Sequence, residues 1–121
     1  MSDKTEIGRL GENLAANFLK EKGFTVAARN FRFGKAEIDL IVQRDEWLLF
    51  VEVKTRSSVA YGQPEEFLTL QQMNRIFDAA EEYIYRVDWQ GHVRFDIVSI
   101  QLGGDIFGND ALIEHLEDAI N

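Results

Sequence analysis

The chain has 121 residues, of which 45% are hydrophobic and 28% are charged, a composition typical of a folded domain with a modest core. No run of 18 or more apolar residues is present, and the first residues lack the apolar core of a secretion signal, so we expect no membrane partner. The absence of cysteine excludes disulfides, thiolate zinc sites and cysteine nucleophiles, and a cytoplasmic protein is the expectation.

The net charge of −8 is unevenly distributed along the chain. Residues 1–60 carry ten Lys and Arg against nine Asp and Glu, whereas residues 61–121 carry three against twelve. An acidic chain argues against a general nucleic-acid coat protein. An anionic partner is expected to meet the first half, and three basic side chains there are candidates for nucleic-acid binding: Arg32, Lys35 and Arg56.

Residues 5–22 are predicted to form a helix, because Ile7, Leu10 and Leu14 begin an apolar stripe at helical spacing. Gly8 and Gly11 lie in or beside that stripe and would let the helix approach a sheet closely.

Three strands are then predicted, at 24–33, 36–43 and 46–55. The connections between them are only about two residues long, so the strands must form an antiparallel meander.

A loop is predicted at 57–68, a helix at about 70–87 and a further strand at 92–100. The last strand should lie parallel to the third, since a helix connects them. Residues 101–121 are ambiguous between a short strand and a terminal helix, and we treat them as a tail appended to a single domain spanning 1–121. The two histidines, His92 and His115, stand alone in the sequence and receive no role.

Charged residues interrupt two of the apolar strands. Glu52 and Lys54 share one face of the third strand, and Asp39 lies between apolar residues of the second. The turn at 44–45 would place Asp39 opposite about residue 51, so the three side chains should converge. Two adjacent carboxylates repel each other unless a hard divalent cation such as Mg²⁺ bridges them. The simpler alternative is a structural salt bridge on a solvated strand face.

Five motifs carry a family resemblance: GEN after GRL (8–13), RNFRFGKAEIDLI (29–41), FVEVKTR (50–56), YGQPEE (61–66) and VRFDIVSI (93–100). In this order they resemble the YraN-like family of small, largely uncharacterised proteins. That family is similar to the PD-(D/E)xK nuclease superfamily and to archaeal Holliday-junction resolvases. The resemblance implies an α/β, restriction-endonuclease-like fold with a four-stranded mixed sheet flanked by helices, in the element order αβββαβ.

The resemblance also implies a metal-dependent endonuclease acting on DNA, branched or junction DNA included. Asp39 and Glu52 would hold Mg²⁺ or Mn²⁺, together with Glu12 and the Val53 carbonyl. Lys54 would orient the attacking water or stabilise charge on the phosphate.

Gln72 would face the same site, although Thr69 and Gln72 also have the spacing of a helix-capping box, which explains the glutamine without chemistry.

Glu37 shares a strand face with Asp39 and is either a further acid of the site or a partner for Lys35 or Arg29. Two alternative functions stay open: a nucleic-acid-binding module that does not cleave, and a protein-interaction domain that uses the acidic second half. A homodimer is also left open.

Overall fold

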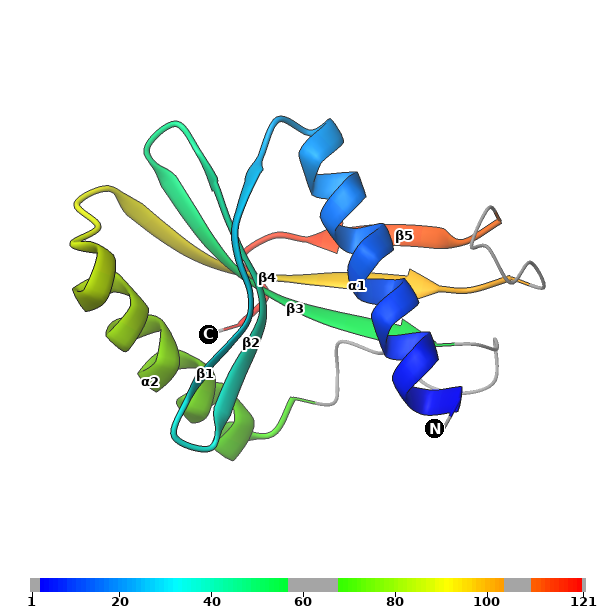
Figure 1. The fold of residues 1–121 in the computed structure, drawn as a ribbon, viewed down its shortest axis with the longest axis horizontal. Coiled ribbons are helices and arrows are strands. Elements are labelled where there is room, and N and C mark those ends of the chain that lie inside the picture. Colours follow the sequence, from blue (N-terminus) through cyan, green and yellow to red (C-terminus); the bar gives the residue numbers. More distant parts are fainter. Residues whose placement is uncertain (1–2, 57–67, 104–109, 121) are drawn as a thin grey trace.

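The computed structural model describes residues 3–56, 68–103 and 110–120. Its elements, in chain order, are α1 (Asp3–Glu21), β1 (Thr25–Phe33), β2 (Ala36–Arg44), β3 (Trp47–Arg56), α2 (Leu70–Val87), β4 (His92–Gln101) and β5 (Leu112–Leu116). The strands form one mixed sheet in the order β1-β2-β3-β4-β5. The predicted α/β class is confirmed, and the arrangement is consistent with a restriction-endonuclease-like core (Figure 1).

The two helices cover opposite faces of the sheet, as the side-chain alternation along β3 shows. Leu49 and Val51 are buried against α1, whereas Leu48 and Phe50 are buried against α2. Successive side chains of a strand point to opposite faces, so each helix has its own apolar layer. Neither helix, among the residues described, is long and apolar enough to cross a membrane.

Helix α1 approaches the sheet closely at one glycine. A Cβ atom on Gly11 would collide with the side chain of Thr55 in β3, so only glycine fits there. A Cβ atom on Gly8 would meet nothing within 4 Å, so the expectation of close approach holds for Gly11 and not for Gly8. The helix ends before Gly23, whose φ of 95° is a conformation that favours glycine.

The predicted antiparallel meander is confirmed. Gly34, with φ of 62°, lies in the turn between β1 and β2, and Asp45, with φ of 54°, lies in the turn between β2 and β3. In the second hairpin Leu40 pairs with Val51, which is the partner that the short turn predicts.

The connection from β3 to β4 passes through α2, and the two strands are parallel, as predicted. The Thr69 hydroxyl accepts a hydrogen bond from Gln72 N–H at 3.0 Å, and the Gln72 side chain accepts one from Thr69 N–H at 2.8 Å. This reciprocal cap contributes about 1 kcal/mol and fixes where α2 begins. The predicted loop at 57–68 lies outside the described residues except for Leu68.

Within the described residues the sheet has five strands, which corrects the predicted number of four. Residues 112–116, in the segment treated as an appended tail, pair antiparallel with β4 and form its outer neighbour. Ile120 is buried in the apolar layer beside α2. The sequence is ambiguous here because five residues are too short a stretch for periodicity to separate strand from helix.

A buried ionic cluster joins β5 to β4 and to the end of α1. The fully buried Asp96 carboxylate accepts two hydrogen bonds of 2.9 Å from Arg94 and one of 2.9 Å from Asp118 N–H. His115 Nε2 lies 2.7 Å from Asp96, and Lys22 Nζ lies 2.8 Å from His115 Nδ1. An ammonium group only donates, so Nδ1 accepts and the Nε2–H donates to Asp96.

The balance of this cluster favours the ionised carboxylate. Burial raises the pKa of Asp96, but the hydrogen bonds with His115, Arg94 and the Asp118 amide outweigh burial and hold it below its usual value. His115, which the sequence leaves without a role, is therefore part of the fold's polar core.

Candidate active site

Asp39 lies where the regular pleat of β2 is interrupted. Ile38 packs on the α2 side and Leu40 on the α1 side, although residues two apart in a regular strand share a face. The paired residues of β2 and β3 extend as far as Leu40 and Val51. Beyond that pair, Val53 N–H donates to Asp39 Oδ2 at 2.8 Å. The side chain of Asp39 therefore turns toward β3 and holds the backbone there.

Glu52 brings a second carboxyl group to the same place. It precedes Val53 in β3, and its carboxyl group lies close enough to that of Asp39 for each to shift the pKa of the other. The structure thus brings Asp39 and Glu52 together, as the hairpin register predicts. Val53 takes part through its amide N–H, and the metal-ligand role expected for its carbonyl stays a prediction.

Both carboxyl groups hold protons more tightly than usual. Burial, opposed by the Val53 amide and reinforced by the charge of Glu12, raises the pKa of Asp39 from 3.8 to about 6. Burial and the charge of Asp39 raise the pKa of Glu52 from 4.5 to about 8, while Lys54 lowers it. Burial and mutual repulsion thus favour retention of one proton by the Asp39–Glu52 pair in the metal-free protein.

One oxygen of this pair is left over. Among the described residues, Glu52 Oε1 is the buried side-chain polar atom that has no hydrogen-bond partner. An unpaired buried oxygen is costly, and such atoms often mark ligand sites. No group of three or more His, Asp or Glu side chains in the described parts of the chain could hold a metal ion. Mg²⁺, however, is often held by one or two carboxylates, with water and phosphate completing its shell, so this pair fits a weakly bound hard cation.

Asn30 places two further acids beside the pair. Its backbone is left-handed, with φ of 52°, and its Nδ2 lies 3.2 Å from both oxygens of Glu12 and 2.9 Å from Glu37 Oε2. Glu12 is thereby held close enough for its charge to raise the pKa of Asp39. Sequence reasoning missed Asn30, because no strand pattern marks the position at which the backbone becomes left-handed.

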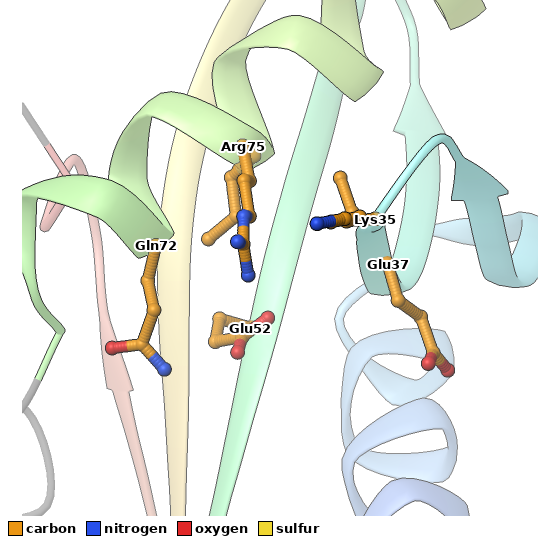
Figure 2. Close-up of a pocket in the computed structure, with 7 residues that line it drawn as sticks. Lys35, Glu37, Glu52, Gln72 and Arg75 are labelled. Atoms are coloured by element: carbon orange, nitrogen blue, oxygen red, sulfur yellow. The ribbon is translucent and has the colours of Figure 1, made fainter.

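A pocket of about 160 Å³ opens beside Glu52. It is lined by Lys35, Ala36, Glu37, Glu52, Gln72, Arg75 and Ile76, which come from the β1–β2 turn, β2, β3 and α2. Figure 2 shows the Arg75 guanidinium and the Lys35 ammonium directed into this space above Glu52. Arg75 is a residue that sequence reasoning missed, although it lies three positions after Gln72 and thus on the same helix face.

Gln72 both caps helix α2 and faces the pocket, so the two interpretations of this residue from the sequence are compatible. It completes the capping box with Thr69, and it also lines the pocket with Glu52. The capping bond engages the side-chain oxygen, so the amide NH₂ is the group that could reach a ligand.

Comparison with known proteins places the chain in a family. The model of the uncharacterised protein family UPF0102 matches residues 11–100, which include every acid of the candidate site. The chain belongs to UPF0102. A UPF0102 protein of Cytophaga hutchinsonii is 46% identical over 93 residues, covering 77% of this chain and 82% of the relative. One of Flavobacterium psychrophilum is 38% identical over 119 residues, covering 98% and 97%. The resemblance to the YraN-like family is therefore confirmed.

The basic side chains predicted for the site of this UPF0102 protein come from β1, β3 and the turn between β1 and β2. Lys54 is half-buried in β3, close enough for its charge to lower the pKa of Glu52. Arg32 is 76% exposed and lies 3.4 Å from Glu37, and Lys35 is exposed at the rim of the pocket. Arg56 is the last residue of β3. For Glu37, the structure thus shows ion pairing with Arg32, a partner that the sequence analysis does not anticipate.

Proposed function

We propose that this UPF0102 protein is a metal-dependent nuclease that hydrolyses phosphodiester bonds of DNA, branched or junction DNA included. The observation that carries the proposal is the Asp39–Glu52 pair, with raised pKa values and one unpartnered oxygen. Perturbed carboxyl groups held against their own repulsion are more frequent at functional sites than in structural cores. The family resemblance to PD-(D/E)xK nucleases points to the same residues.

In the proposed mechanism Asp39 and Glu52 hold Mg²⁺ or Mn²⁺, with Glu12 beside them. The bound cation would polarise the scissile phosphate and lower the pKa of a coordinated water. Deprotonation of Glu52 accompanies binding, since a carboxylate and not a carboxylic acid is the ligand. The Val53 amide keeps Asp39 oriented toward β3 throughout.

Lys54 supplies positive charge beside the reaction centre. Its ammonium group would orient the attacking water or stabilise the negative charge that develops on the phosphate in the transition state. Gln72 would contribute hydrogen bonds from its amide NH₂ across the pocket. Arg32 and Arg56 would hold flanking phosphates of the DNA strand.

The proposal is tested by incubating branched, duplex and single-stranded DNA with the protein in Mg²⁺ or Mn²⁺. Cleavage by the wild type, its loss in Asp39→Ala and in Lys54→Ala, and its retention in Glu81→Gln are the expected results. Glu81 is exposed on α2 and provides a matched control for loss of one charge.

Two results would replace the proposal. DNA binding that depends on salt, without cleavage of any substrate, would favour the non-cleaving binding module. Neither binding nor cleavage would favour the protein-interaction domain. Cleavage that persists unchanged in Asp39→Ala would show that the activity does not come from this site.

A further inference from the structure

Two cations that have no acidic partner among the described residues face the pocket beside Glu52. Lys35 reaches it from the β1–β2 turn and Arg75 from α2. Neither belongs to any ion pair or side-chain hydrogen bond in the part of the chain that the structure describes. Arg75 is half-buried, and its guanidinium carries five N–H donors that an anion in the pocket can engage. The arrangement is therefore suited to an anion that enters from outside.

The acids that line the pocket do not neutralise these two charges. The Glu37 carboxylate is engaged by Arg32 at 3.4 Å and by Asn30 at 2.9 Å, and Figure 2 shows it directed away from Arg75. The carboxyl group of Glu52 lies beside that of Asp39, and burial together with the charge of Asp39 raises its pKa, which favours its neutral form. Counting only the residues that the structure describes, the walls above Glu52 thus carry two uncompensated positive charges from different elements.

The lining of the pocket also indicates what kind of group would enter it. None of its described lining residues is aromatic, so the pocket offers no platform for stacking a nucleobase. A guanidinium presents paired N–H donors that match two phosphate oxygens, and an ammonium acts on the same anion as a point charge. The amide NH₂ of Gln72 adds a neutral donor.

We infer that the pocket between Lys35 and Arg75 is a phosphate subsite, which binds a phosphate group of the nucleic-acid strand next to the reaction centre rather than at it. The inference rests on the proposed function for the identity of the strand. The chemistry is shared by two sources, a phosphodiester within the strand and a phosphate at its end.

The first experiment uses inorganic phosphate and no divalent metal, so that it is independent of cleavage. Nuclear magnetic resonance titration of the wild type should show saturable shifts at pocket residues. Arg75→Gln should weaken phosphate binding about tenfold or more, the effect typical of losing hydrogen bonds to a charged group. Arg75→Lys should retain part of the affinity, since it keeps the charge and loses the paired donors.

Arg86→Gln provides the matched control. Arg86 is on the same helix, away from the pocket, and its loss changes the net charge equally. The affinity of Arg86→Gln for phosphate should stay within about twofold of the wild type, because a charge outside the pocket acts on the bound anion only through the solvent-screened field. Equal losses in Arg75→Gln and Arg86→Gln, or no saturable binding by the wild type, would overturn the inference.

The second experiment separates the two sources of phosphate. Short single-stranded DNA of one sequence is prepared with a 5′-phosphate or with a 5′-hydroxyl. Each strand is titrated with two proteins, the Asp39→Asn variant, which prevents cleavage, and the double variant that carries Asp39→Asn and Arg75→Gln. If Arg75→Gln lowers the affinity only for the phosphorylated strand, the subsite binds a terminal phosphate. If it lowers the affinity equally for both strands, the subsite binds a phosphate of the backbone. No loss with either strand would refute the subsite while leaving the nuclease proposal intact. A nuclease assay that fails while phosphate still binds would refute the proposed function alone.

Discussion

Replacing Glu52 by Gln should stabilise the metal-free protein, and the gain should grow with pH. The pKa of Glu52 is raised from 4.5 to about 8 in the folded protein, so the fold keeps a proton that the unfolded chain has released. Stability linked to this group is fully present below about pH 4.5 and is lost as the pH rises toward 8. Glutamine has the same shape and does not titrate, so the variant avoids that loss.

The size of the effect follows from the same values. The difference between 4.5 and about 8 corresponds to about 5 kcal/mol at 1.36 kcal/mol per pKa unit, which is an upper bound. Glu52 is half-buried as a residue, so solvent screening reduces the effect and we expect a measured gain of about 1–3 kcal/mol at high pH. Little difference should remain at about pH 5, where only a small part of the linked free energy has been lost.

The assay is urea unfolding of both proteins in a chelator at about pH 5, 7 and 9. The difference in free energy of unfolding between variant and wild type isolates the Asp39–Glu52 pair, because titrating residues outside the pair contribute equally to both proteins. Glu81→Gln, an exposed change on α2, should show no such pH dependence. A gain that is constant with pH, or a loss at every pH, would refute the assignment of a shared proton to the Asp39–Glu52 pair.

Three other predictions address the metal, the DNA path and the buried cluster. Asp39→Asn should abolish Mg²⁺ or Mn²⁺ binding measured by calorimetry in the presence of DNA, and equal metal binding by both proteins would contradict this. The melting temperature of the metal-free variant should be unchanged or higher, since the amide oxygen of Asn can still accept a hydrogen bond from Val53 N–H. Neutralising Arg32, Lys35 and Arg56 together should weaken DNA binding measured by fluorescence anisotropy. This triple variant should also reduce the salt dependence of the binding constant by roughly one unit of slope per lost phosphate contact. Neutralising Glu81 and Glu82 should leave that slope nearly unchanged, and a triple variant that binds like the wild type would place DNA elsewhere. Asp96→Asn should destabilise the fold by about 3–5 kcal/mol in urea unfolding at neutral pH, because it removes the buried carboxylate that pairs with the partly buried Arg94 guanidinium and accepts from His115. The wild type should lose the same contribution as the pH falls below the usual carboxyl range, since the pKa of Asp96 is lowered, and a substitution without effect on stability would show that the cluster adds none.

The sequence by itself determined most of the architecture. Helical spacing of apolar residues, two short turns and a capping box are local signals, and they predicted α1, the β1–β2–β3 meander and α2 closely. The turn at 44–45 also fixed which residues of β2 and β3 are opposed, because a short hairpin leaves one register. The proximity of Asp39 and Glu52 therefore follows from local sequence alone.

The tertiary structure decided what depends on segments distant in sequence. β5 is defined by its pairing with β4 and by the hydrogen bond between His115 and Asp96. Five residues carry too little periodicity to indicate a strand. Arg75 joins the site only because α2 packs on the face of the sheet from which Glu52 lines the pocket. Asn30 gathers Glu12 and Glu37 with a left-handed backbone, a conformation that asparagine tolerates but that a strand pattern does not mark. The raised pKa values have the same origin, since burial and neighbouring charge exist only once the chain has folded.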